Sequence, residues 1–404
     1  MINTGDTAFM IICAALVCLM TPGLAFFYGG LVNKKNVLTI MMQSFISMGV
    51  VTILWFFIGF SLAFGPDIHG IIGGLKYVCL SAVGMDPNPD YGPTIPFLTF
   101  FSYQQMFAII TPALITGAFA DRVNFKSYLV FLIFWSLLIY VPLAHWVWGG
   151  GFLQELGVVD FAGGIVVHAS AGLAALASVF FVGKRNLSDK TETDPHNVTH
   201  VALGTALLWF GWFGFNAGGA LGANSLASTA FINTDIAAST AMVTWLFISW
   251  KREKAPSFVG VLTGAVAGLA TITPAAGFVK PWAAVVIGLC AGVVCYFAVQ
   301  LRQRLGWDDA LDVWGVHGVG GMMGTILLGV FAEKSVNGIS GLIEGDVYQF
   351  GVQILGTVVA AVYAFVVTLL ILKAVNRFIP VRVSQEEEQL GLDASLHHEE
   401  AYHI

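Results

Sequence analysis

Long uninterrupted runs of apolar residues dominate this sequence and limit what it can fold into. The chain of 404 residues is 57% hydrophobic and only 10% charged, whereas a soluble domain carries about 25% charged residues. A helix needs about 20 apolar residues to cross a bilayer. The runs are continuous rather than alternating with period two, which argues against a membrane β-barrel. We therefore predict an all-α polytopic membrane protein with eleven transmembrane helices, over residues 8–31, 37–64, 97–119, 126–146, 161–183, 198–216, 225–250, 256–273, 281–301, 310–331 and 350–376.

The lysines and arginines test this number of spans. If the runs cross the membrane in alternation, 15 of the 18 basic residues fall on one side and 3 on the other. Because basic residues concentrate in cytoplasmic loops, we predict an N-terminus outside the cell and a C-terminus in the cytoplasm. The localisation that follows is the cell inner (plasma) membrane. No basic residue precedes Lys34, so we expect the first run to be a retained span rather than a cleaved signal peptide.

Two segments share a pattern of one carboxylate and one imidazole. Residues 160–172 read DFAGGIVVHASAG and residues 309–321 read DALDVWGVHGVGG, so that Asp160 precedes His168 by eight residues, as Asp309 precedes His317. The first pattern lies in the fifth predicted span and the second in the tenth, so the two helices run in opposite directions. This arrangement predicts a five-plus-five inverted repeat, with the eleventh helix outside it.

The repeat places both histidines at similar depth from opposite faces of the membrane. Eight residues of helix rise ~12 Å, so in a hydrocarbon core about 30 Å thick the two imidazoles are expected to meet near the midplane. Ionisable side chains inside a membrane usually mark a pathway, and a His–His pair can pass a proton or polarise a small polar solute. The alternative is an interhelical hydrogen bond with no further role.

The acids in these two segments have more than one possible role. Asp160 can cap its helix by accepting from backbone N–H groups, and its position also suits orienting loop carbonyls near an outer site. Asp309 and Asp312 are either structural caps at the cytoplasmic end or functional groups, and the sequence leaves both roles open. We assign no role to Asp235, which lies within the seventh predicted span.

The sequence gives little support for metal, cofactor or nucleic-acid chemistry. Metal sites usually need three or more protein ligands, and no third His or Cys converges on His168 and His317; His145 is expected at an outer helix end. The five cysteines show no CxxC spacing, which indicates neither a disulfide framework nor a metal site. No basic patch suggests nucleic acid. We expect a protein that is not an enzyme and holds no cofactor and no metal.

Four segments together resemble one known family. DFAGGIVVHASAG, HWVWGGG at 145–151, LLWFGWFGFNAGG at 207–219 and DVWGVHGVGG at 312–321 resemble the ammonium transporters of the Amt/Mep/Rh superfamily, specifically the Amt branch. The resemblance runs from about residue 5 into the tail. It implies eleven helices, an inverted repeat, ammonium or ammonia as substrate, and a homotrimer in membrane lipid with one pore per subunit.

The resemblance implies roles for pore residues. The twin histidines of the family match His168 and His317, and its stacked phenylalanine gate matches Phe107 and Phe215. A dry path lined by two imidazoles disfavours a charged species, which favours deprotonation of ammonium before it enters. A potassium ion has no proton to release, so it cannot enter such a path as a neutral species.

The resemblance also implies an external recruitment site formed by Trp148, Phe107 and Gly219, with Asp160 as its orienting acid. An indole face attracts a cation by ~0.5–2 kcal/mol. Many relatives carry a Ser hydroxyl where this chain has Gly219, so we predict weaker ammonium recruitment than in those relatives. The other tryptophans are interpreted as lipid-facing or packing residues, including Trp209, Trp212 and Trp245.

The polar C-terminal segment suggests a second functional unit. We expect a transporter domain over residues 1–377 and a cytoplasmic regulatory tail over 378–404. Its sequence GLDASLHHEEAY resembles the tail of the family, where PII-type signal-transduction proteins dock. The alternative is a solvated, partly disordered tail. Two other hypotheses for the whole chain stay open: an ammonium sensor coupled to a cytoplasmic partner, and a Rh-like gas channel.

Overall fold

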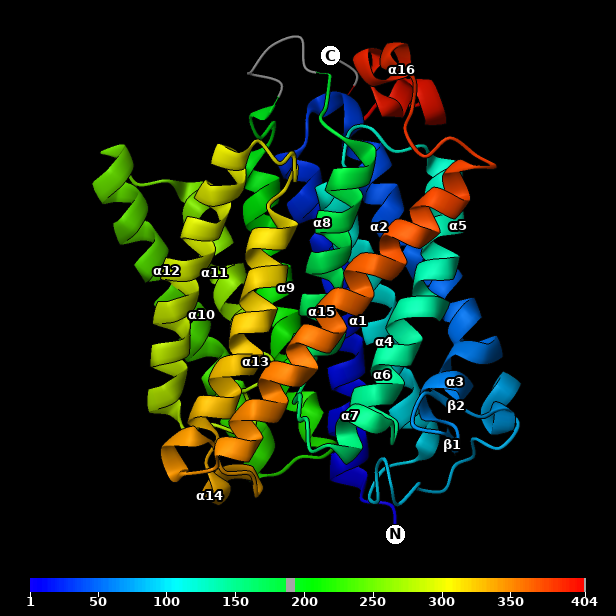
Figure 1. The fold of residues 1–404 in the computed structure, drawn as a ribbon, viewed down its shortest axis with the longest axis vertical. Helices are drawn as coiled ribbons and strands as arrows, with labels where there is room; N and C mark the ends of the chain where they lie inside the picture. Colours follow the sequence, from blue (N-terminus) through cyan, green and yellow to red (C-terminus); the bar gives the residue numbers. More distant parts are fainter. Residues whose placement is uncertain (187–192, 403–404) are drawn as a thin grey trace.

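The computed structural model of the chain describes residues 1–186 and 193–402, and it is a bundle of long helices (Figure 1). In this described part, ten helical segments are long and apolar enough to cross a membrane. The fold class predicted from the apolar runs, an all-α membrane protein, is confirmed. The helices are α1 (Thr4–Leu31), α2 (Val37–Leu54), α3 (Phe60–Phe64), α4 (Phe97–Ile115), α5 (Phe125–Trp135), α6 (Val141–Trp148), α7 (Phe152–Glu155), α8 (Ser170–Val182), α9 (Val198–Ala217), α10 (Ser225–Glu253), α11 (Phe258–Ile272), α12 (Pro281–Leu305), α13 (Val319–Phe331), α14 (Lys334–Asn337), α15 (Val347–Asn376) and α16 (Gln385–Leu390).

One predicted span differs from the others. The run 256–273 forms α11, which has 15 residues and is about 22 Å long at 1.5 Å per residue. It packs against α10 and α12. The part of the chain that the structure describes therefore has ten helices long enough to span a membrane and one shorter apolar helix, and the number eleven stays a prediction.

The two ends of the bundle differ in what they carry. The N-terminus, α7, α14 and the antiparallel hairpin of β1 (Asp67–Ile68) and β2 (Ile72–Gly73) lie at one end, which we call the N-face (Figure 1). The C-terminal segment with α16 lies at the opposite end, the C-face. The chain thus begins at one end of the bundle and finishes at the other.

Single-turn π-helical segments precede α8 and α13. They span Gly164–Ala169 and Trp314–Gly318 and contain the two histidines. The helix that follows Asp160 begins three residues later than predicted, because Gly163 adopts φ +120°, a conformation open to glycine but strained for other residues. The predicted start at residue 161 therefore differs by three residues from the observed start at Gly164.

Small residues bring the two histidine helices together. A Cβ added to Gly172 on α8 would lie 2.1 Å from the backbone of Gly318, and one added to Gly321 would lie 2.7 Å from Cβ of His168. Backbones can approach this closely only where side chains are absent. The glycines that follow each histidine thus determine how closely the two rings approach.

The tail is packed on the C-face rather than solvated. The Asp393 carboxylate accepts hydrogen bonds from the backbone N–H groups of Leu38 (2.9 Å) and Thr39 (2.8 Å), at the start of α2. Glu388 accepts from the backbone of Asn186 and pairs with Arg382. The part of the tail around Glu388 and Asp393 is therefore packed against the C-face, while Phe378 and Leu390 are exposed.

Candidate functional site

His168 and His317 meet in the interior of the bundle. Their Nδ1 atoms are 3.2 Å apart and the ring planes differ by 20°, with exposed fractions of 1% and 4%. One Nδ1 must donate and the other accept, because a neutral imidazole has one N–H and one lone pair. Whichever ring donates, one Nε2 is left as an acceptor and the other as a donor. The pair therefore offers one donor and one acceptor to a neighbouring solute.

A narrow apolar cavity adjoins the histidine pair. Its volume is about 10 Å³, which is room for about one water-sized molecule. Among the described residues, Nε2 of His168 has no hydrogen-bond partner, although buried polar atoms are usually paired. The cavity can therefore supply a small polar solute to this atom. It is lined by Met20, Leu24, Phe27, Ile110, Leu114, Val167, His168, Leu208, Trp212, Phe215, Val266 and His317.

The two phenylalanines predicted as a gate contact each other on the N-face side of this cavity. The ring centroids of Phe107 and Phe215 are 4.2 Å apart and the rings are tilted by 35°. Both are fully buried. Phe215 lines the narrow cavity and Phe107 lines a larger cavity beyond, so the rings separate the narrow cavity from the N-face.

That larger cavity, the N-face vestibule, has a volume of about 330 Å³. It is lined by Phe107, Trp148, Asp160 and Gly219, which the sequence assigned to a recruitment site. The indole of Trp148 meets Phe107 edge to face, with centroids 6.1 Å apart, and its Nε1 donates to the backbone oxygen of Asp160 at 2.8 Å. A Cβ on Gly219 would lie 2.7 Å from the carbonyl oxygen of Phe161, so a larger residue requires Phe161 to move.

The Asp160 carboxylate is a helix cap. It accepts from the N–H groups of Gly163 (2.8 Å), Gly164 (2.7 Å) and Ile165 (2.7 Å), with Val166 at 3.3 Å. Since its oxygens are occupied in this way, it acts on the vestibule through its backbone carbonyl, which orients Trp148.

The second segment is built in the same way at its start. The Asp309 carboxylate accepts from the N–H groups of Val313 (3.1 Å) and Trp314 (2.7 Å). Of the two roles left open for the acids here, Asp309 takes the structural cap. Asp312 instead forms an ion pair with Arg302 and is not a cap.

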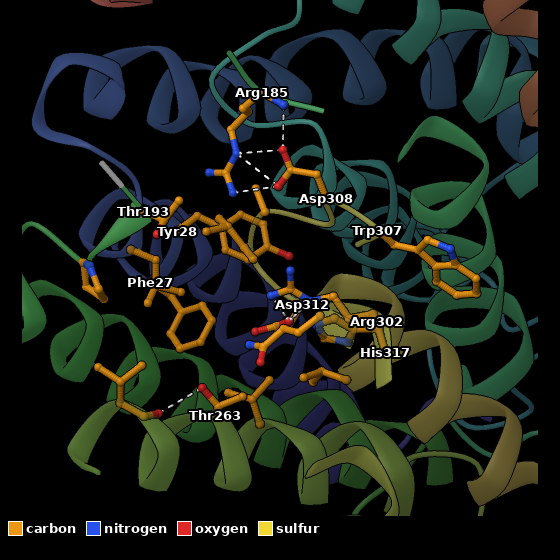
Figure 2. Close-up of a pocket in the computed structure, with 18 of the residues that line it drawn as sticks. Phe27, Tyr28, Arg185, Thr193, Thr263, Arg302, Trp307, Asp308, Asp312 and His317 are labelled. Carbon is orange, nitrogen blue, oxygen red and sulfur yellow. Dashed lines mark hydrogen bonds and ion pairs between the residues drawn. The ribbon is translucent and has the colours of Figure 1, made fainter. Parts of the chain in front are cut away.

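A second vestibule opens from the histidines to the C-face. It has a volume of about 730 Å³ and His317 lies at its inner end. Figure 2 shows its ionic lining: the guanidinium of Arg185 points at the carboxylate of Asp308, and Arg302 pairs with Asp312 close to His317. The site is therefore a narrow centre between two vestibules of different character.

Two arginines and two aspartates of the C-face vestibule form ion pairs, Arg185 with Asp308 and Arg302 with Asp312. Arg185 donates to Asp308 (2.8 Å) and to Asp121 (3.0 Å). Burial by itself raises the pKa of Asp308, but the hydrogen bonds and charge of Arg185 outweigh it and lower the pKa to about 2. Burial likewise lowers the pKa of Arg185, and the two carboxylates outweigh it and raise that pKa.

Two residues of the site were missed by sequence reasoning. Trp212, interpreted as lipid-facing or packing, stacks on His168 with centroids 5.3 Å apart at 22° and lines the central cavity. Tyr103 donates to the backbone oxygen of Phe215 at 2.6 Å. Helical spacing is the sequence signal that could have identified Trp212. It lies three residues before Phe215 and therefore shares its helix face.

Among residues 1–186 and 193–402, no three His, Cys, Asp or Glu side chains gather in a way that could hold a metal ion. Asp235 is half-buried on α10, outside the residues that line these cavities. The functional groups of the site are thus imidazoles, aromatic rings and ion pairs.

Comparison with known proteins agrees with this architecture. The Ammonium Transporter Family matches residues 8–402 of the chain. The ammonium transporter of Bacillus subtilis is 49% identical over 98% of both chains. Ammonium transporter Amt1 of Archaeoglobus fulgidus is 45% identical over 99% of this chain and 100% of the relative.

Solved structures agree as well. Mep2 of Candida albicans is 36% identical and superposes with a TM-score of 0.89, covering 96% of this chain and 88% of its own. A protein described as a sensor Amt protein is 31% identical with a TM-score of 0.90, covering 97% and 98%. The fold and the paired buried histidines define a polytopic membrane protein with a narrow apolar cavity at its centre. The chain belongs to the ammonium transporter family.

Proposed function

We propose that this protein transports ammonium across the membrane through the passage that contains His168 and His317. The observation that carries the proposal is the buried histidine pair beside a cavity of about 10 Å³, with a vestibule on each side. Transfer of an ion into such an apolar space without compensating groups is strongly unfavourable, whereas a small neutral solute can hydrogen-bond to the free Nε2. Ammonia is then the species that passes the histidines.

The N-face vestibule is the proposed recruitment site. The rings of Trp148 and Phe107 present π-faces and edges to a cation, an attraction of ~0.5–2 kcal/mol. Ammonium gives up its proton at this site, and the contacting rings of Phe107 and Phe215 exclude hydrated ions. Because the Asp160 carboxylate already accepts four backbone N–H groups, it is not the proton acceptor. The proton passes to water or along the histidines, giving electroneutral or electrogenic transport.

The orientation of the protein follows from its charges. We infer that the N-face is outside and the C-face is cytoplasmic, because the predicted loops on the C-face side carry 15 of the 18 basic residues. We further infer that the helices form a five-plus-five inverted repeat with one additional helix. The cap construction shared by Asp160 and Asp309 supports this repeat.

Regulation and assembly form part of the same proposal. The tail contacts the start of α2 through Asp393 and the loop after α8 through Glu388, so a PII-type protein that displaces it would alter the C-face. The homotrimer, with one pore per subunit in the plasma membrane, rests on the family. Deleting residues 378–404 is expected to change transport and abolish PII binding; an unchanged rate together with retained binding would contradict a regulatory tail.

A sensor role is the second candidate, favoured by the likeness to the sensor Amt protein. The two functions are separated by an ammonium jump applied to proteoliposomes that contain the purified chain, with potassium as the control. A transporter gives a current, or a rapid internal pH rise if transport is electroneutral. A sensor binds ammonium and gives neither signal.

A further inference from the structure

His145 is a fully buried histidine whose ring nitrogens both face hydrogen-bond acceptors. Nδ1 lies 2.9 Å from the carbonyl oxygen of Ala63, and Nε2 lies 2.8 Å from Oδ1 of Asp67. A neutral imidazole has one N–H and one lone pair, so it could satisfy only one of these partners. Both contacts are hydrogen bonds only when the ring carries two protons. The geometry of His145 therefore requires an imidazolium paired with the Asp67 carboxylate.

This ion pair belongs to a set of contacts that fasten the β1–β2 hairpin to the end of α6. Nε1 of Trp146 donates to the backbone oxygen of Ile71 at 2.8 Å. The backbone N–H of Phe152 donates to the oxygen of Gly70 at 2.9 Å. The hairpin is thus tied to the chain on both sides of Trp148.

The turn after Trp148 leaves no space between its backbone and the ion pair. A Cβ added to Gly149 would lie 2.0 Å from the Ala63 oxygen and 2.8 Å from Nδ1 of His145. The N–H of Gly149 also donates to the backbone oxygen of His145 at 2.9 Å. A movement of the imidazole or of the Ala63 carbonyl would therefore displace Gly149 and, with it, the neighbouring Trp148.

We propose that His145 is a positioning residue for the recruitment site: as an imidazolium held by Asp67, it fixes Trp148 against Phe107. This inference rests on the proposed function, because it concerns the residue that receives the cation. It predicts that loss of the His145–Asp67 pair changes the affinity for ammonium rather than the rate of passage.

The groups around the pair keep its carboxylate charged. The charged and titratable side chains nearby are Asp67, His69 on the hairpin, and Tyr91 with Asp90 on the following loop. The hydrogen bond from His145 lowers the pKa of Asp67, and the N–H of Gly70 adds to this. The carboxylate therefore stays ionised and holds the imidazole ring in place.

The first test compares Asp67→Asn with the wild type in proteoliposomes across a pH series. Asp67 is one-third exposed and lies outside the passage, so the variant is expected to fold. We expect the half-saturating ammonium concentration to rise several-fold at neutral pH with an unchanged maximal current. Comparison at each pH removes the effect of ammonium speciation.

The matched control is Asp86→Asn, which removes an exposed carboxylate on the same face and should behave as the wild type. Equal half-saturation of the wild type and Asp67→Asn at every pH would overturn the inference. If the wild type transports no ammonium at all, the proposed function fails instead.

The second test does not depend on transport. ¹⁵N-histidine labelling of the full chain reports the protonation of each ring, and the signal lost in His145→Gln identifies His145. An imidazolium signal at neutral pH that becomes neutral in Asp67→Asn is the expected result. A neutral ring in the wild type would overturn the inference even if ammonium transport is confirmed.

Discussion

The two vestibules lead to the same histidine pair but are built from opposite chemistry. The N-face vestibule presents aromatic rings, with Trp148 and Phe107 at its base. The C-face vestibule is twice as large and is lined by ion pairs such as Arg185 with Asp308. Aromatic faces attract a cation without neutralising it. Carboxylates that are already paired with arginines, in contrast, have little net charge left to attract a cation. Under the proposed function, this difference is expected if the cation is selected at the N-face and released at the C-face.

The largest expected effect comes from breaking the C-face ion pairs. Arg185→Met removes the cation that pairs with Asp308 and Asp121, and removing one member of a buried pair destabilises by about 3–5 kcal/mol. We expect a markedly lower thermal unfolding midpoint in detergent. The control Arg304→Met removes an exposed arginine and should have little effect. Equal midpoints for both variants would show that the ionic lining is not structural.

A pH series sharpens the same comparison. The pKa of Asp308 in the folded protein is about 2, below the ordinary value of an aspartate. Its ion pair therefore stabilises the fold above the ordinary carboxyl range, and this stabilisation is lost as pH falls through about 2. The stability difference between wild type and Asp308→Asn should therefore be constant near neutral pH and shrink only in strong acid. A difference that disappears between pH 7 and 5 would contradict the assigned pairing.

Aromatic recruitment predicts a moderate effect at the N-face. Trp148→Leu removes the indole face, and a loss of ~0.5–2 kcal/mol corresponds to a roughly 2- to 30-fold rise in half-saturating ammonium. The matched control is Trp282→Leu, which removes a tryptophan that is half-exposed on α12 and outside the vestibule. An unchanged half-saturation in Trp148→Leu would leave the N-face vestibule without a recruiting role.

The smallest expected effect concerns Gly219. A side chain here displaces Phe161, so the proper comparison is Gly219→Ser with Gly219→Ala, which share that displacement. The hydroxyl should add about 1 kcal/mol of binding, or roughly fivefold lower half-saturation in Ser than in Ala. Identical values for the two variants would refute the prediction that the missing hydroxyl weakens recruitment.

The convergence of the histidines was predictable because it follows from helix rise. The spacing of eight residues from Asp160 to His168, repeated from Asp309 to His317, placed both rings at one depth in antiparallel spans. The helix start was not predictable from spacing, because it depends on the positive φ of Gly163.

Contacts between distant loops could not be predicted in the same way. The Arg185 network joins residues 121, 185 and 308 from three loops, and no local pattern links their positions. The stacking of Trp212 on His168 could be predicted only from the face of α9 that points inward. Because α9 is apolar on all sides, its sequence does not indicate that face. Pairing of Asp312 with Arg302 likewise depends on how α12 packs.

The central claim is that the histidine pair decides which species passes. The most direct measurement is the ammonium-induced current in proteoliposomes with the wild type and with His168→Ala, using potassium as the competing ion. The account predicts an ammonium-specific signal in the wild type, as a current or as an internal pH rise, and its loss or the loss of selectivity against potassium in the variant. A variant that transports ammonium with the same rate and selectivity would contradict it.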